Sequence, residues 1–310
     1  MPEGAVGGRF RHLAFFYRGA RDYVTRTTAF IHGGLDAGEP VAVAVPQPKL
    51  DLLRSELGAS AAQVWLVDMS RAGRNPGRII PAIVRKFADA HPRTRVRIVS
   101  EPIWPGRNEQ EYPACVQHEA LINLALADRA VTKVCPYDAA ALSAKVMADA
   151  AGTHPILMDE AGEHLSPDYS PEQVLDTYNV PLSEPSAEPV VLTFDSGMLS
   201  AVRALVLREA RRAGLAADRT LDLELVVSEL AANTFEHGGG SGTLRTWRQD
   251  GYLICEVRDL GVITDPLMGR HSVDPAVPGG RGVLLVHHLA DLVRLHTWLG
   301  GTTTRAYFAL

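Results

Sequence analysis

The stretch SELAANTFEHGGG, residues 228–240, has the pattern of a helix that ends in three glycines. Within it, Glu229, Asn233 and His237 follow one another at intervals of four residues. At about 100° per residue, such positions drift by only ~40° per step, so the three side chains lie along one stripe of the helix. The stripe puts a carboxylate, a carboxamide and an imidazole into an otherwise apolar face. This pattern predicts a functional site rather than a packed core.

The composition is that of an ordinary globular protein. The chain has 310 residues, of which 46% are hydrophobic and 22% charged, and its formal net charge is −5. This length suits about two domains, and the negative balance argues against nucleic-acid binding through a basic surface. Its three cysteines form no CxxC pair, and no apolar run approaches the ~18 residues of a membrane span. We therefore expect a reduced, soluble, cytoplasmic protein that binds neither nucleic acid nor membrane.

The first half alternates apolar runs with amphipathic stretches, which predicts an α/β domain with a mostly parallel sheet. The predicted strands are 12–17, 40–46, 64–69, 95–100 and 131–138. Gly33 and Gly34 predict the end of the first helix. The loop FFYRGARDY after the first strand lacks the Gly-x-x-x-x-Gly-Lys-Ser/Thr pattern, so we expect a Rossmann- or RecA-like fold without a phosphate loop. Asp68, at a strand end, is then expected to be a helix cap or a structural acid.

The segment VPLSEPSAEP, residues 180–189, is rich in proline, serine and glutamate and predicts an interdomain linker. Domains are therefore expected at 1–179 and 190–310. In the second domain, one strand and two helices precede a hairpin with its turn at Asp250–Gly251, and one helix precedes two final strands. Helices on one face of an antiparallel sheet form an α+β layer.

Three motifs follow one another in this second domain. The first is the helix with the polar stripe. The second is VRDLG (257–261), in which a strand ends at Asp259, and the third is PGGRGVLLV (278–286), in which glycines lead into a helix. A glycine-rich loop before a helix presents backbone N–H groups and a positive dipole end to phosphate. A carboxylate at a strand end can accept a hydrogen bond from an exocyclic amine. A carboxamide oxygen suits Mg²⁺, and a glutamate one turn away can act as a general base.

The three motifs together resemble the GHKL superfamily, which includes gyrase, Hsp90, histidine kinases and MutL and has the Bergerat nucleotide-binding fold. ELAANTFEHGG is similar to its N box, RDLG to its first glycine box and GGRGVLLV to its second. The short spacing is most similar to bacterial anti-sigma-factor serine kinases, in particular to an actinobacterial group in which this domain follows a MEDS sensory domain. HLAFFY, FIHGGLDAGEPVAVAVP and QHEALINLALA in the first half are similar to MEDS.

The resemblance implies a role for each motif residue. Glu229 is expected to be the catalytic base, and Asn233 to bind Mg²⁺. His237 matches the N-box histidine, and a cofactor contact and a structural cap are equally open for it. Asp259 is expected to bind the adenine amino group, with Gly261 allowing close approach. The other residues expected at ATP are Gly280, Arg281 and Gly282 near the phosphates, and Thr302 or Thr303 near the adenine.

Two features depart from the family pattern. Ile263 replaces the second glycine of the first glycine box, and a β-branched residue resists positive φ, so this loop must take another path. The segment expected to close over ATP is short and contains Pro266, Pro275 and Pro278. ATP affinity and turnover are left open by these changes.

The function implied by the resemblance is that of an ATP–Mg²⁺-binding anti-sigma factor and protein serine kinase, controlled by its N-terminal sensory domain. The expected partners are a sigma factor and a STAS-type anti-anti-sigma protein with an acceptor serine, together with a small-molecule ligand of the first domain. A homodimer is compatible with this interpretation. A non-catalytic docking module is the alternative. A histidine kinase is disfavoured, because the helix at 197–214 contains no histidine.

A few groups of the first domain have side chains that could sense a ligand or bind metal. They are His12, Tyr17, Cys115, His118 and Cys135. The sequence does not place them near one another, and buried cysteines are commonly core residues, so a metal site is the less favoured interpretation.

Overall fold

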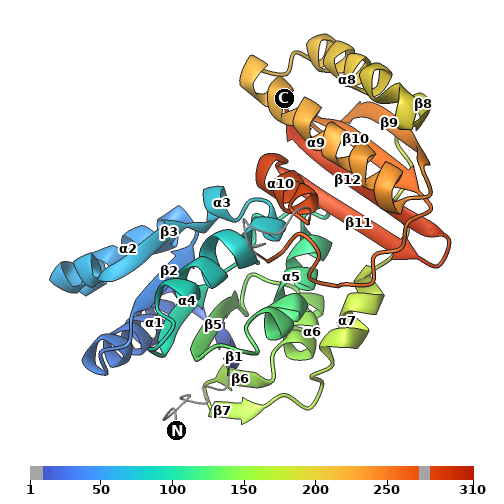
Figure 1. The fold of residues 1–310 in the computed structure, drawn as a ribbon. Helices are drawn as coiled ribbons and strands as arrows, with labels where there is room; N and C mark the ends of the chain where they lie inside the picture. The colour runs from blue at the N-terminus through green and yellow to red at the C-terminus, as the bar shows by residue number, and fades with distance from the viewer. Residues whose placement is uncertain (1–9, 272–279) are drawn as a thin grey trace, which may run out of the picture. The chain divides into compact units, whose positions relative to one another are not determined.

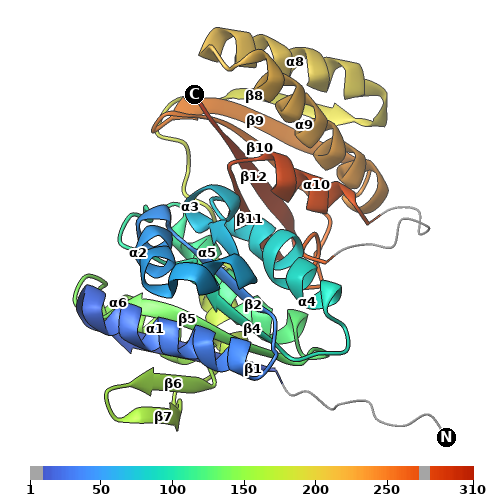
Figure 2. The same cartoon turned by 90° about the vertical axis from the view of Figure 1, so that its left-hand side faces the viewer.

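The computed structural model describes residues 10–271 and 280–310, shown as a ribbon in Figure 1 and from a second direction in Figure 2. The chain divides into two compact units, Met1–Tyr178 and Asn179–Leu310. Pro275 and Pro278, expected in the segment over ATP, lie outside the described residues. Among the helices of the described ranges, none combines the length and apolar character needed to cross a membrane.

The N-terminal unit is built on a seven-stranded sheet of order β3-β2-β4-β5-β1-β6-β7. Its strands are β1 (Arg11–Tyr17), β2 (Val41–Val45), β3 (Val64–Asp68), β4 (Val96–Ser100), β5 (Val131–Asp138), β6 (Ile156–Asp159) and β7 (Gly162–Leu165). Every neighbouring pair is parallel except β6–β7, so the predicted mostly parallel α/β fold is confirmed. The hairpin β6–β7 was not predicted, because both strands are four residues long and β7 is largely exposed.

Helices cover both faces of this sheet, and each face has its own core. Helices α1 (Gly19–Asp36) and α2 (Gln47–Leu57) contribute to one core, and α5 (Tyr112–Ala125), α6 (Ala144–Thr153) and α7 (Pro171–Tyr178) to the other. Along β1, Leu13 and Phe15 belong to the first core and Ala14 to the second, the alternation expected of a strand. The remaining α-helices in the described part of this unit are α3 (Met69–Ala72) and α4 (Lys86–Ala90). As expected, Asp68 caps α3 by accepting a hydrogen bond from the Ser70 backbone N–H (3.0 Å).

The prediction that α1 ends at Gly33 and Gly34 was wrong, since the helix continues to Asp36. A Cβ atom at position 34 would lie 2.8 Å from Arg97 Cδ and 2.8 Å from a methyl carbon of Val41. The two glycines therefore let the helix approach β2 and β4 closely, and they do not terminate it.

The C-terminal unit is an antiparallel sheet of order β11-β12-β10-β9-β8 with helices on one face. Its elements are β8 (Val190–Asp195), α8 (Leu199–Ala213), α9 (Ala217–His237), β9 (Ser241–Gln249), β10 (Tyr252–Asp259), α10 (Gly282–Leu289), β11 (Leu292–Trp298) and β12 (Gly301–Ala309). Figures 1 and 2 both show α8 and α9 side by side along the sheet. One apolar core fills the space between these helices and the sheet. The predicted α+β layer is confirmed, and Asp250 and Gly251 form the hairpin turn with φ of 49° and 78°.

The opposite face of this sheet carries an ionic network that reaches into segment 180–189. The Glu184 carboxylate binds Arg245 (2.6 Å) and Arg258 (2.9 Å), and both arginines also bind the buried carboxylate of Glu256. Hydrogen bonds from the two arginines lower the pKa of Glu184 to about 2. The segment has no helix or strand before β8, yet Glu184 attaches it to the C-terminal unit.

A buried carboxyl group lies in the N-terminal unit directly after β4. Glu101 is completely buried, and its Oε1 accepts a hydrogen bond from Lys49 Nζ. Its Oε2 has no hydrogen-bond partner among the described residues. Burial raises the pKa of Glu101 to about 7, and the Lys49 ammonium opposes the rise.

We predict a pH-dependent difference in the free energy of unfolding between the wild type and Glu101→Gln. Measured relative to the variant, the wild-type value falls by about 3 kcal/mol between about pH 4.5 and pH 8. A raised pKa in the folded state means that protonation of the carboxyl group favours folding. This stabilising contribution is complete below the pKa of the unfolded state and is lost as the pH rises through 7. Urea unfolding of both proteins at several pH values measures the difference. The exposed Glu109→Gln variant is the control, and a pH-independent difference for Glu101→Gln would contradict the prediction.

Candidate functional site

A pocket of about 280 Å³ lies at one end of the helix-covered face of the C-terminal sheet. Its polar lining consists of Asn233, His237, Asp259, Thr302 and Thr304. Its apolar and glycine lining consists of Leu230, Gly238, Val257, Gly261, Val262, Ile263, Met268, Val283 and Leu295. A concave, mainly apolar surface with a few converging polar groups is typical of a small-molecule site.

Two hydrogen bonds orient the carboxylate of Asp259 in the pocket. This residue ends β10, where its Oδ2 accepts a hydrogen bond from Thr234 Oγ1 (2.7 Å) and its Oδ1 accepts one from the Gly261 N–H (2.9 Å). The carboxylate stays half-buried in this position. Each oxygen has a further lone pair, so the oriented group can still accept a hydrogen bond from a ligand.

Glycine is required next to this carboxylate because neighbouring atoms approach too closely for a side chain. A Cβ atom at Gly261 would lie 2.7 Å from the carbonyl oxygen of His237, and one at Gly238 would lie 2.6 Å from Asp259 Cγ. Neither glycine has a positive φ. The packing, and not an unusual backbone conformation, therefore excludes other residues here.

The two predicted threonines of β12 face opposite sides of the sheet. Thr302 lines the pocket, where its hydroxyl donates to the Gly261 carbonyl oxygen (2.7 Å), whereas Thr303 lines a different cavity with Glu184. Because side chains alternate along a strand, Thr304 accompanies Thr302 into the pocket and Thr303 cannot. Thr304 was not among the residues expected at the site, although the same alternation would have indicated it.

Glu229 and Asn233 meet the start of α10. A Cβ atom at Gly282 would lie 2.7 Å from Glu229 Oε2 and 3.6 Å from Asn233 Oδ1, so the first turn of α10 rests against both side chains. Both are half-buried, but only Asn233 lines the pocket. The first N–H groups of a helix have no acceptor inside it, and in α10 the helical hydrogen bonds begin with Leu285 N–H to the Arg281 carbonyl (2.9 Å).

The other expected site residues are more exposed. Gly280, with φ of 72°, and Arg281 are both exposed and directly precede α10. The side chain of His237 lies at the pocket and is 74% exposed, with Nε2 3.7 Å from the Glu236 carboxylate. The structure therefore brings Asn233, His237, Asp259, Gly261 and Thr302 to the pocket, with Gly282 and Glu229 beside it.

The loop after Asp259 accommodates Ile263 without a left-handed conformation. Among the described residues, Asp250 is the only one other than glycine with a positive φ. The Ile263 N–H donates to Thr297 Oγ1 (3.1 Å), and the residue lines the pocket. Ile263 thus forms part of the apolar wall.

Two family models match the two halves of the chain. The model described as MEDS, "MEthanogen/methylotroph, DcmR Sensory domain", matches residues 11–155, and the model "Histidine kinase-like ATPase domain" matches residues 192–308. The chain joins a MEDS domain to a histidine kinase-like ATPase domain. The resemblance to these two domains, inferred above from sequence motifs, is confirmed.

A solved structure is similar to part of the chain. A crystal structure of the RsbU and RsbW domains of Rv1364c from Mycobacterium tuberculosis is 20% identical in sequence, with a TM-score of 0.30. The match covers 40% of this chain and 33% of that chain, so this chain spans about a third of the length of that structure. No curated protein gives a significant match. The two domain assignments therefore rest on the family models.

We predict that Gly261→Ala destabilises the ATPase domain by about 2 kcal/mol, because the added methyl group would overlap the His237 carbonyl oxygen. Gly197→Ala is the matched control in the same domain. There the new Cβ atom would meet its nearest neighbour, Asp195 Oδ1, at an ordinary 3.4 Å. Urea unfolding of the full chain measures both changes, and equal effects of the two substitutions would contradict the packing argument.

Proposed function

We propose that this chain is an ATP-dependent signalling regulator, an anti-sigma factor and protein serine kinase whose ATPase domain is controlled by the MEDS domain. The observation that carries the proposal is the pocket in which an oriented Asp259 carboxylate and the Asn233 carboxamide line the same space. The match to the histidine kinase-like ATPase model supports ATP as the ligand. The similarity of the motifs to anti-sigma serine kinases supports the type of regulator.

Adenine recognition is assigned to Asp259 and its surroundings. The exocyclic amine of adenine is a hydrogen-bond donor, and the carboxylate is held in place to accept it. The hydroxyl of Thr302, held by the Gly261 carbonyl, lies in the same pocket, and Leu230 and Val257 supply apolar surface for the ring. Guanine carries a carbonyl oxygen at the corresponding position. It would face the carboxylate as a second acceptor, which disfavours GTP.

The triphosphate and Mg²⁺ are assigned to the region where α9 meets α10. The Asn233 Oδ1 atom is a hard oxygen ligand of the kind that Mg²⁺ accepts, and the missing side chain at Gly282 leaves backbone close to it. When bound, Mg²⁺ would neutralise phosphate charge. The backbone N–H groups at the start of α10 and the exposed Arg281 would bind phosphate oxygens.

Phosphotransfer is assigned to Glu229 as general base. Its carboxylate, one helical turn from Asn233 and next to Gly282, would accept the proton of a serine hydroxyl as that oxygen attacks the γ-phosphorus of ATP. The bond between the γ-phosphorus and the β–γ bridging oxygen would break in the same step and release ADP. The acceptor serine would belong to a STAS-type anti-anti-sigma partner, and the second partner would be a sigma factor. A homodimer is compatible with this scheme.

We predict that the wild type binds ATP–Mg²⁺ with a micromolar Kd and that Asp259→Asn binds it at least tenfold more weakly. The substitution replaces one acceptor oxygen of the carboxylate by an amide nitrogen that can only donate hydrogen bonds. Titration calorimetry of the full chain measures both values. Asp250→Asn, in the exposed hairpin turn at the other end of β10, is the matched control and should bind ATP as the wild type does. Absence of ATP binding by the wild type would sink the proposal and favour the docking-module interpretation.

A second prediction separates binding from catalysis. Glu229→Gln should bind ATP with nearly unchanged affinity, yet transfer phosphate to a STAS-type partner about 100-fold more slowly or not at all, since it cannot accept the serine proton. Transfer from γ-labelled ATP to the partner is the readout. Rapid transfer by Glu229→Gln would rule out Glu229 as the base.

A further inference from the structure

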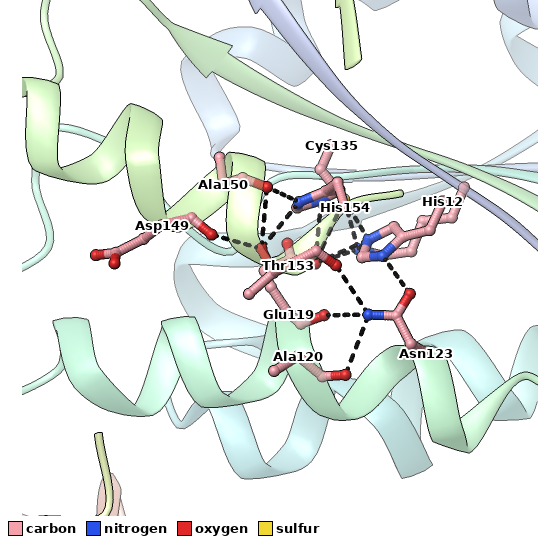
Figure 3. A network of polar contacts seen from close by, with 10 residues as sticks. His12, Glu119, Ala120, Asn123, Cys135, Asp149, Ala150, Thr153 and His154 are labelled. Carbon is pink, nitrogen blue, oxygen red and sulfur yellow. Dashed lines mark hydrogen bonds and ion pairs between the residues drawn. The ribbon is translucent and has the colours of Figure 1, made fainter. Parts of the chain in front are cut away.

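Four potential metal ligands from distant parts of the MEDS domain meet in its interior, as Figure 3 shows. His12 lies on β1, Glu119 on α5, Cys135 on β5, and His154 directly after α6. All four residues are completely buried, and their ligand atoms lie within 4.8 Å of one another. Of the sequence candidates, His12 and Cys135 belong to this cluster, whereas Cys115 does not.

Four of the six separations between the ligand atoms are close to those of a tetrahedral metal site. Glu119 Oε2 lies 3.1 Å from His12 Nε2, 3.5 Å from Cys135 Sγ and 3.6 Å from His154 Nε2. His12 Nε2 lies 3.3 Å from Cys135 Sγ. Ligands at the corners of a tetrahedron with metal–ligand bonds of about 2.0–2.3 Å are separated by about 3.3–3.8 Å. One ion therefore fits between these groups with only small side-chain movements.

Both imidazoles are oriented by hydrogen bonds on their outer nitrogens. His12 Nδ1 lies 3.0 Å from Asn123 Oδ1, and His154 Nδ1 lies 2.8 Å from the Ala150 carbonyl oxygen. The Asn123 amide nitrogen donates to three backbone carbonyls, so its oxygen must face His12. A carbonyl oxygen can only accept, so Nδ1 carries the hydrogen in both rings and the Nε2 lone pairs point into the cluster.

In the structure, the ammonium group of Lys133 lies against three of the four potential ligands. Its completely buried Nζ lies 2.6 Å from Cys135 Sγ, 2.8 Å from Glu119 Oε2 and 3.2 Å from His12 Nε2, so its three N–H donors are all used. Within the described part of the chain, His154 Nε2 and Glu119 Oε1 remain buried without a hydrogen-bond partner. The cluster thus contains more acceptors than one ammonium group can satisfy, and unsatisfied buried acceptors destabilise a fold.

We propose that His12, Glu119, Cys135 and His154 bind one Zn²⁺ ion in the MEDS domain, and that the Lys133 ammonium takes the place of the ion in the metal-free protein. Two imidazoles, a thiolate and a carboxylate at tetrahedral spacing form a donor set that suits zinc. Binding would ionise the Cys135 thiol and move the Lys133 ammonium away from the ligands. Metal loading would therefore release a proton.

The test is a titration of the metal-free full chain with Co²⁺, a spectroscopic substitute for Zn²⁺. We expect one Co²⁺ per chain, with the visible bands of tetrahedral cobalt and a thiolate-to-cobalt charge-transfer band, and we expect one equivalent of Zn²⁺ to abolish both. Cys135→Ser should lose the charge-transfer band and bind Zn²⁺ more than about tenfold more weakly, since even outer hydrogen-bond partners of ligands contribute 10–100-fold. Cys115→Ser, at another buried cysteine of the same domain, is the control and should keep the spectrum.

Lys133→Met should strengthen metal binding, whereas Cys135→Ser should weaken it. Without the competing ammonium, this variant should bind Co²⁺ at least tenfold more tightly than the wild type, a gain that a misfolded protein would not show. Circular dichroism checks that each variant is folded. The proposal is overturned if neither the wild type nor Lys133→Met binds Co²⁺ stoichiometrically, or if the charge-transfer band survives in Cys135→Ser.

Discussion

The carboxylate of Asp259 joins the elements that form the pocket of the ATPase domain. It accepts hydrogen bonds from Thr234 on α9 and from the backbone of Gly261 in the loop after β10. The Gly261 carbonyl in turn accepts the hydroxyl of Thr302 on β12. These short contacts require glycine at 238 and 261, because a Cβ atom at either position would overlap neighbouring atoms. One carboxylate therefore both links the elements around the pocket and lines the pocket itself.

The two domains keep polar groups away from bulk water in different ways. In the ATPase domain, Asp259 is half-buried and satisfied by neutral donors, so a ligand can still reach it. In the MEDS domain, the carboxylate of Glu119 on α5 is completely buried, and the Lys133 ammonium balances its charge. A buried charge needs such a partner because desolvation strongly disfavours an isolated ion. The first arrangement suits an organic ligand that enters from solvent, and the second suits a small cation.

Much of the fold could be predicted because hydrophobic periodicity is a local property. The five longer strands of the MEDS domain and the elements of the ATPase domain follow apolar runs and turn residues such as Asp250–Gly251. The errors arose where a distant contact decides the conformation. Gly33 and Gly34 continue α1 because Arg97, far along the chain, packs against them. The short strands β6 and β7 form by pairing with β1 and with each other, and four residues each are too few to show a periodic pattern.

The sequence by itself determined which residues share an element: the stripe of Glu229, Asn233 and His237 on one helix, Asp259 at a strand end, and glycines before a helix. These follow from the fixed geometry of helices and strands. Only the tertiary structure decided which of these residues meet. It places Thr302 and Thr304 in the pocket and Thr303 on the other side of the sheet. It also gathers His12, Glu119, Cys135 and His154 from four separate elements, because the order of strands in the sheet sets such distances and no local pattern encodes it.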